Sequence, residues 1–71
     1  MKISDSKSLG KAIKERRKKL GITQKYVSDF TGFSVSFLSE LENGKATCEL
    51  GKALYIINLL GLDIELTARG E

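Results

Sequence analysis

The chain has 71 residues, which is enough for one small domain with a single hydrophobic core. Hydrophobic residues make up 41% of the chain and charged residues 30%, a balance that is typical of a folded globular protein and excludes a disordered tail. No apolar run approaches the ~20 residues of a membrane span, and residues 1–5 lack the apolar run of a signal peptide, so we expect a cytoplasmic protein.

The positive charge is concentrated in the first third of the chain. Residues 1–25 contain nine Lys and Arg residues against two acids, whereas residues 26–71 contain three against seven. This division indicates one cationic face, as found in nucleic-acid-binding proteins. A solvated helix face is the alternative explanation of the same charges.

The sequence is poor in residues that carry catalysis. It has no histidine and a single cysteine, Cys48, so neither a nucleophile–base pair nor a zinc site can be assembled. The stretch Gly44-Lys45-Ala46-Thr47 differs from a phosphate-binding loop, because Ala46 replaces the hydroxyl residue that follows the lysine. We therefore expect no enzymatic activity, no metal and no cofactor. A membrane-surface role for the basic first helix is disfavoured, since the core needs the narrow apolar face of that helix.

Helical periodicity predicts a first helix over residues 8–20 and a short second helix behind it. Gly21 ends the first helix, because glycine favours the backbone conformation that follows a helix C-terminus. Thr23 is a good N-cap for the second helix, and Gly32 ends it. The expected buried residues of the second helix are Val27 and Phe30. Ser34 then caps a third helix, with Leu38 and Leu41 facing inward and Asn43-Gly44 at its end.

The predicted fourth helix, over residues 48–60, is apolar almost all round. Thr47 is its N-cap and Gly61 its stop. One apolar stripe is assigned to the domain core and consists of Leu50, Ala53, Leu54, Ile57 and Leu60. Tyr55, Ile56 and Leu59 lie on the other side and also require burial, which a monomer of this size hardly provides, so we expect a dimer interface there.

Residues 62–68 change the period of the apolar pattern to two. Leu62, Ile64 and Leu66 alternate with polar residues, as in a half-buried strand. A lone strand leaves its backbone groups without partners, so we expect this segment to pair with the same segment of a second chain. A frayed tail packed on its own domain is the alternative. The expected interface residues of the homodimer are Ile56, Leu59, Leu62, Ile64 and Leu66.

Residues 23–44 form two short helices that meet at a tight turn, with small Ser28 where the helices touch and Gly32 in the turn. The most informative runs are Gly21-Ile22-Thr23-Gln24, Gly32-Phe33-Ser34 and Leu41-Glu42-Asn43-Gly44-Lys45. Over residues 8–61 the chain resembles the Cro and phage-repressor class of helix-turn-helix domains. The tail from Leu60 to Leu66 resembles that of HipB-type antitoxins, whose domain ends in a dimerising strand. These resemblances imply an all-α, lambda-repressor-like domain of four to five helices, with an N-terminal extension (1–7), a DNA-binding domain (8–61) and a C-terminal β-strand and tail (62–71) that pairs across a dimer.

The resemblance also implies which side chains bind DNA. Gln24 contacts a phosphate, although capping its own helix is an alternative, and Val35 and Ser36 reach base edges in the major groove. Glu40, one turn later, either accepts from a base or stays in solvent. The DNA-binding residues expected on this basis are Gln24, Lys25, Ser34, Val35, Ser36, Ser39, Asn43 and Lys45. The lysines expected to steer DNA at long range, only a minority of which need to touch it, include Lys11, Lys14, Lys18 and Lys19.

Arg17 and Glu42 lie at positions that, in the resembled family, form a partly buried ion pair, and we favour that role over a DNA contact for Arg17. Tyr26 and Phe37 are expected to be packing residues and not stacking platforms. The function implied is a sequence-specific, double-stranded DNA-binding regulator of transcription: a dimeric repressor of its own operon on a palindromic operator, acting at the nucleoid. The alternative is an antitoxin of a HipBA-like pair that binds a HipA-like toxin as well as DNA.

Overall fold

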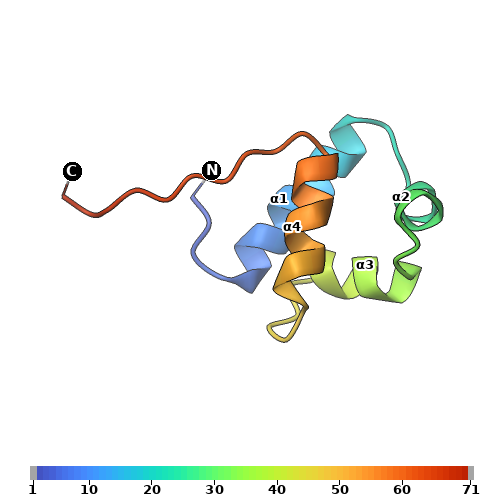
Figure 1. Cartoon of the computed structure of the whole chain (residues 1–71), viewed down its shortest axis with the longest axis horizontal. Helices are drawn as coiled ribbons and strands as arrows, with labels where there is room; N and C mark the ends of the chain where they lie inside the picture. The colour runs from blue at the N-terminus through green and yellow to red at the C-terminus, as the bar shows by residue number, and fades with distance from the viewer. Residues whose placement is uncertain (1, 71) are drawn as a thin grey trace.

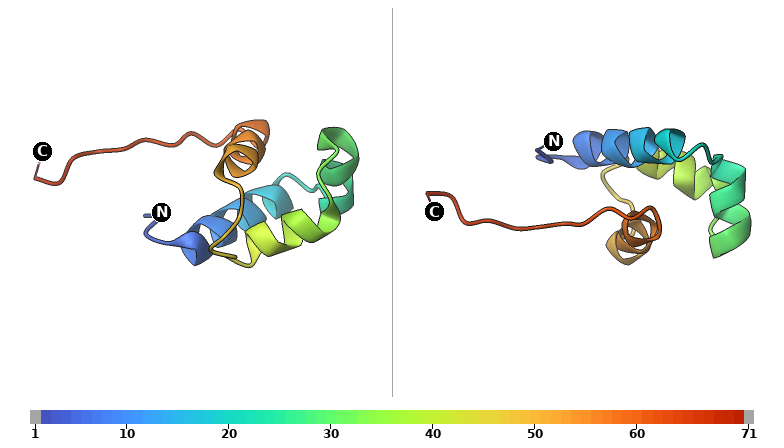
Figure 2. Two further views of the ribbon diagram at one scale, coloured as in Figure 1. Left: turned by 60° about the horizontal axis from the view of Figure 1, so that its bottom comes forward. Right: turned by 90° about the horizontal axis from the view of Figure 1, so that it is seen from above.

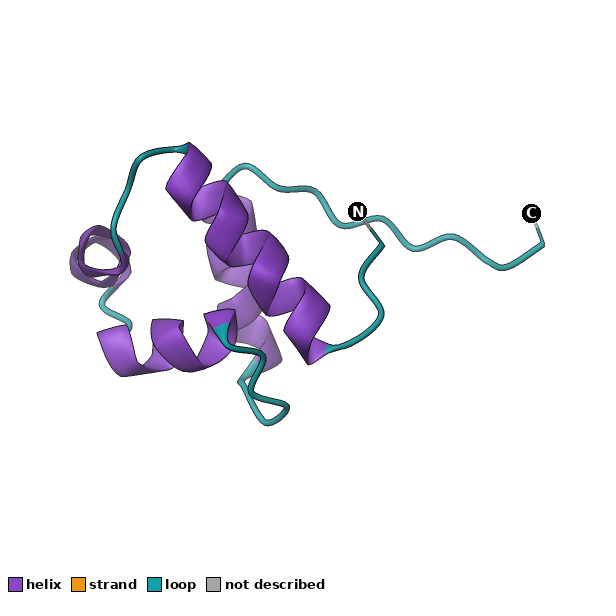
Figure 3. Cartoon of the chain, turned by 180° about the vertical axis from the view of Figure 1, so that it is seen from behind, coloured by secondary structure: helices purple, strands orange, loops and turns teal. Residues whose placement is uncertain are grey.

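The computed structural model describes residues 2–70 and contains four helices, α1 (Ser6–Lys19), α2 (Gln24–Thr31), α3 (Val35–Glu42) and α4 (Leu50–Leu59) (Figure 1). Within this part of the chain all other residues are loops and turns, and no strand is present (Figure 3). The expectation of an all-helical domain is therefore confirmed. None of these helices is both long and apolar enough to cross a membrane.

The first three helices begin at polar caps. α1 starts two residues earlier than expected, because the Asp5 carboxylate accepts a hydrogen bond from the Ser8 backbone N–H while the Ser8 hydroxyl accepts one from the Asp5 N–H. Thr23 and Ser34 cap α2 and α3, as expected. The predicted cap Thr47 is wrong: Glu49 occupies the N-cap of α4, without a side-chain hydrogen bond, and residues 47–49 belong to the preceding loop.

The turn between α2 and α3 requires glycine. Gly32 has a φ of 80°, in the left-handed region, and its N–H donates to the Ser28 carbonyl to close the last turn of α2. The chain then needs only Phe33 before Ser34 caps the next helix. This short connection sets α2 and α3 at the steep angle seen at the right of Figure 1.

All four helices contribute to one core. Its buried apolar residues are Ile13, Val27, Leu38, Leu41, Ala53, Ile56, Ile57 and Leu60. The expectation that Phe30 is buried is wrong, since it is 62% exposed. The apolar stripe assigned to the fourth helix is confirmed for Ala53, Ile57 and Leu60, which are buried. It is wrong for Leu50 and Leu54, which are exposed, whereas Ile56 is buried. Ile56 therefore belongs to the domain core, and the expectation that it lies in a dimer interface is wrong.

The segment after α4 leaves the domain as an extended chain (Figures 1 and 2). Its start is fixed, because the Leu62 N–H donates to the Ile57 carbonyl and Arg16 Nε donates to the Leu60 carbonyl at 2.8 Å. Leu62 packs on the core, whereas Ile64 is 51% exposed and Leu66 96% exposed. The strand expected here is absent from the single chain: among residues 2–70, no backbone hydrogen bond joins residues 63–70 to another segment.

Candidate nucleic-acid interface

α3 has one side in the core and the other in solvent. Leu38 and Leu41 are buried, while Val35 is 44% exposed and Ser36 is exposed beside it. Ser34 Oγ accepts from the Phe37 N–H at 3.0 Å, which leaves the first backbone N–H groups of α3 directed outward. The exposed start of α3 thus consists of small side chains and helix-terminal donors, which are suited to a close approach by an acidic surface. Glu40, further along the helix, is partly exposed and paired with Lys45.

Aromatic packing holds the start of α3 against α4. The ring of Phe33 lies edge-on to those of Phe37 and Tyr55, with 5.7 Å between centroids in both pairs. Lys52 Nζ lies 5.5 Å from the Phe33 and Phe37 centroids. Phe37 therefore packs within the domain, as expected, whereas Tyr26 is 57% exposed and the expectation of packing is wrong for it.

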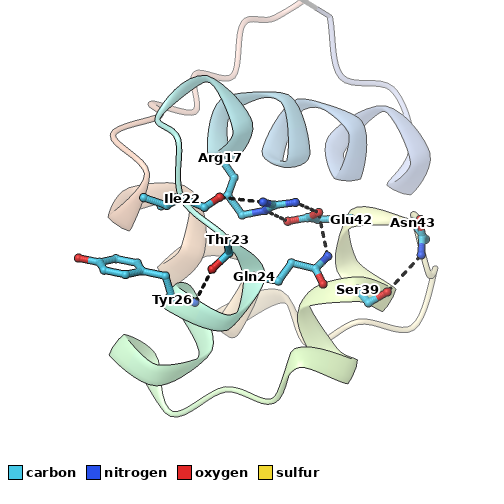
Figure 4. Close-up of polar contacts among 8 residues, drawn as sticks. All are labelled: Arg17, Ile22, Thr23, Gln24, Tyr26, Ser39, Glu42 and Asn43. Carbon is cyan, nitrogen blue, oxygen red and sulfur yellow. Dashed lines mark hydrogen bonds and ion pairs between the residues drawn. The ribbon is translucent and has the colours of Figure 1, made fainter.

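A charged network joins α1, α2 and α3 beside this surface (Figure 4). Arg17 donates to Glu42 from Nε at 2.7 Å and from Nη2 at 3.0 Å, and its Nη1 donates to the Ile22 carbonyl at 2.8 Å. The two side chains are 11% and 4% exposed. Such a buried pair is stable only if its remaining hydrogen-bonding groups are satisfied. Here the Ile22 carbonyl accepts from Arg17, and the Gln24 amide donates to Glu42.

The network determines the charge state of Glu42. Burial raises the pKa of its carboxyl, but hydrogen bonds from Arg17 and Gln24 and the positive charges of Arg17 and Lys14 outweigh burial, so that the pKa lies below its ordinary value of 4.5. The hydrogen bond to Glu42 in turn raises the pKa of Arg17. Both groups are therefore charged at neutral pH.

Gln24 is the first residue of α2 and is part of the same network. Its Nε2 donates to Glu42 Oε1 at 3.0 Å (Figure 4). The alternative that it caps its own helix is not realised, because Thr23 Oγ1 accepts from the Tyr26 N–H at 3.0 Å. An amide nitrogen carries two protons, so one N–H of Gln24 is still available for a ligand at the N-terminus of α2.

Three other expected DNA-binding residues bond to neighbours on the surface. Lys25 Nζ lies 3.1 Å from Asp29 Oδ2, one turn along α2. Lys45 pairs with Glu40, a hydrogen bond that raises the pKa of Lys45. Asn43 Nδ2 lies 3.4 Å from Ser39 Oγ (Figure 4). Exposed pairs of this kind are weak, so a phosphate can replace the carboxylate partner of either lysine.

These features correspond to a known family. Residues 13–66 match the family described as helix-turn-helix. The chain belongs to the helix-turn-helix family. It is similar to an uncharacterized HTH-type transcriptional regulator, y4mF, of Sinorhizobium fredii (strain NBRC 101917 / NGR234), with 30% identity over 70 residues that cover 99% of this chain and 92% of the relative.

Two solved structures have a similar fold. One is a HipB–O4 20mer complex, with 26% identity, a TM-score of 0.86 and coverage of 97% of each chain. The other is a complex of a HipB variant with an O2 20mer, with the same identity and TM-score over 97% of this chain and 96% of that one. The resemblances to helix-turn-helix domains and to HipB are thus confirmed.

The structure brings three of the expected residues to one side of the molecule. Ser39 and Asn43 of α3 and its following turn lie with Gln24 on the side shown in Figure 4. The bond from Gln24 to Glu42 has no signal in the sequence. A Cβ on Gly44 would lie 2.6 Å from the Lys7 Cα, so α1 begins beside the turn after α3. Among residues 2–70, no group of three or more His, Cys, Asp or Glu side chains is arranged to hold a metal ion.

Proposed function

We propose that the chain is a sequence-specific, double-stranded DNA-binding regulator of transcription. The observation that carries the proposal is the exposed side of α3, which presents small side chains while its other side is held by the core. A rod of this kind enters the major groove, where base edges differ in their donors and acceptors. The similarity to a protein named as a transcriptional regulator and to HipB supports the proposal. The protein acts in the cytoplasm at the nucleoid, as a repressor of its own operon.

The proposed contacts divide into two kinds. Val35 meets a thymine methyl group and Ser36 bonds to a base edge, so these two residues contribute specificity. Phosphate contacts position α3 and supply much of the affinity. The residues assigned to phosphates are Gln24, Lys25, Ser34, Asn43 and Lys45, with Ser39 at the border between the two kinds.

Selection of bound duplexes from a random pool tests the proposal. The double variant Val35→Ala/Ser36→Ala is expected to select a different sequence and to lose about 1–3 kcal/mol per base contact on the original duplex. The control, Thr47→Ala/Asn58→Ala, changes exposed residues away from α3 and is expected to select the original sequence. If the wild-type protein enriches no sequence, or if the double variant keeps the original preference, the assignment of α3 is wrong.

A dimer is part of the proposal. Two copies would present their α3 helices about 34 Å apart, one turn of DNA, to a palindromic operator. After exclusion of Ile56, the proposed interface consists of Leu59, Leu62, Ile64 and Leu66, of which Leu59, Ile64 and Leu66 are exposed in the single chain. The extended segment 62–68 would form a strand by pairing with the same segment of the second copy.

A second proposed function is that of an antitoxin that binds a HipA-like toxin. The similarity to HipB supports it, as does a shallow apolar hollow between α2 and the end of α4, lined by Leu20, Ile22, Tyr26, Phe30, Leu59 and Leu60. Co-expression with a kinase-like protein encoded beside it tests this function. The double variant Tyr26→Ser/Phe30→Ser is expected to lose co-purification while duplex binding remains. Failure of the wild-type protein to co-purify excludes the antitoxin and leaves the repressor.

A further inference from the structure

Four lysines form a row along α1. Lys7, Lys11, Lys14 and Lys18 have the spacing i, i+4, i+7, i+11, which places side chains above one another on one side of a helix. Lys14 is half-buried and the other three are exposed. Within residues 2–70 the recorded ion pairs involve Arg17, Lys25, Lys45 and Lys52, and none involves this lysine row.

The lysine row adjoins the proposed DNA interface. Lys14 is near enough to Glu42 for its charge to lower the pKa of that carboxyl, and the backbone of Lys7 lies against Gly44. The row therefore runs beside the end of α3 and the turn that carries Asn43 and Lys45. Arg16 lies two residues from both Lys14 and Lys18, which is about 200° around the helix. Its side chain bonds to the Leu60 carbonyl at the end of α4. The row therefore faces away from α4.

The charges of the row are unfavourable within the protein itself. Lysines at i, i+4 repel each other, and the acid whose charge acts on Lys7 is the N-cap Asp5, which is already bonded to the Ser8 N–H. Glu15 is the sole acid in α1. A solvated helix face normally alternates charges of both signs, so a row of one sign beside a proposed DNA-binding surface points to a polyanionic ligand.

We propose that the lysine row binds the phosphodiester backbone of duplex DNA, beside the groove that α3 enters. The row is about 16 Å long at 1.5 Å per residue, which is long enough to face several consecutive phosphates of one strand, each of which rises 3.4 Å along the duplex axis. It extends the footprint beyond the helix-turn-helix and strengthens binding without adding base specificity. This inference rests on the proposed function, because it requires that α3 is placed on DNA.

The test compares two double variants of the full chain that lose the same charge. One is Lys7→Gln/Lys11→Gln, which leaves Lys14 in place for the stability of Glu42. The matched control is Lys2→Gln/Arg69→Gln, whose residues are exposed and lie outside the row. Circular dichroism and sedimentation equilibrium establish that both variants fold and assemble as the wild-type protein does. Binding to the selected duplex, extended by about ten base pairs at each end to cover roughly one further turn, is then measured as a function of salt.

Each phosphate contact that is lost makes the slope of log K against log salt shallower by about 0.9. We expect the row variant to have a slope shallower than that of the control by about 1–2, with weaker binding at low salt and the same preferred sequence. Equal slopes for the row variant and the control overturn the inference. It is equally overturned if the row variant binds duplexes as the control does but no longer co-purifies with a toxin, since the row is then a protein-binding surface. Absence of sequence-specific binding by the wild-type protein is a different result, because it refutes the proposed function itself.

Discussion

The side-chain carboxylate of Glu42, at the end of α3, is hydrogen-bonded to both α1 and α2. Its Oε2 accepts from Arg17 Nε of α1, and its Oε1 accepts from Gln24 Nε2 at the start of α2. A carboxylate at the end of α3 therefore fixes the position of the helix proposed to read DNA relative to the residue proposed to bind a phosphate. Loss of this charge is expected to reduce both the stability of the domain and the precision of the interface.

The variant Glu42→Gln is expected to lose about 3–5 kcal/mol of unfolding free energy at pH 7, because it leaves Arg17 buried without a counter-ion. The pKa of Glu42 is lowered by folding, so its stabilisation is fully present above about pH 4.5 and is lost as the pH falls through the lower folded pKa. The difference in unfolding free energy between wild type and Glu42→Gln should therefore shrink below pH 4.5. Urea unfolding between pH 3 and 7 measures it. Hydrogen bonds from the Ser8 backbone and hydroxyl also lower the pKa of Asp5. Because Asp5 is present in both wild type and variant, its contribution cancels in the difference between their unfolding free energies. A difference that stays constant with pH would show that Glu42 does not act through its charge.

At the scale of elements, the close approach of α1 to α3 depends on Gly10. A Cβ at this position would lie 2.4 Å from the Leu41 carbonyl oxygen and 2.7 Å from that of Glu42. Gly10→Ala is expected to cost about 1–3 kcal/mol by overpacking, although alanine is the better helix former by about 1 kcal/mol. Gly51→Ala in α4 is the control, because its Cβ meets nothing within 4 Å, and it should stabilise the domain by about 0.5–1 kcal/mol. Thermal unfolding of both variants decides the question: equal stabilisation by both changes would mean that α1 and α3 can separate without cost.

The elements also show what the sequence could and could not predict. α2 and α3 were predicted correctly because Thr23, Gly32 and Ser34 specify a helix start, a turn and a second start within a short span. The apolar pattern of α4 predicts only part of its buried side, because a helix that is apolar on nearly all sides has no polar face to define its orientation. Its orientation is set by the rest of the core, in which Ile56 is 2% exposed while Leu50 is 67% exposed. The candidate site followed from the motif, whereas the bond between Gln24 and Glu42 depends on tertiary packing that no local pattern encodes.

At the scale of the whole molecule, the cationic row lies on α1, whereas the extended segment after α4 carries exposed apolar side chains of its own. The lysine row and the exposed side of α3 adjoin each other beside the Glu42 network, and the extended segment runs out beyond the end of the domain at which α1 begins, away from α2 (Figure 2). That segment exposes Ile64 and Leu66 and carries the acids Asp63 and Glu65. A dimer joined through it would cover this apolar surface and leave the cationic surface of each copy open to DNA.

The period-two pattern of the segment provides a test of that dimer. In a strand, Ile64 and Leu66 share one face, and Glu65 and Thr67 the other. The variant Ile64→Ser/Leu66→Ser is expected to weaken dimerisation at least about 100-fold, since burial of each such side chain contributes roughly 1.5–3 kcal/mol. The matched variant Glu65→Ser/Thr67→Ser should leave the dimer intact. Sedimentation equilibrium measures both, and duplex binding should fall with dimerisation because only a dimer contacts both half-sites of the operator. Equal effects of the two double variants would show that the segment does not pair as a strand, and a dimer that survives both would place the interface elsewhere on the domain.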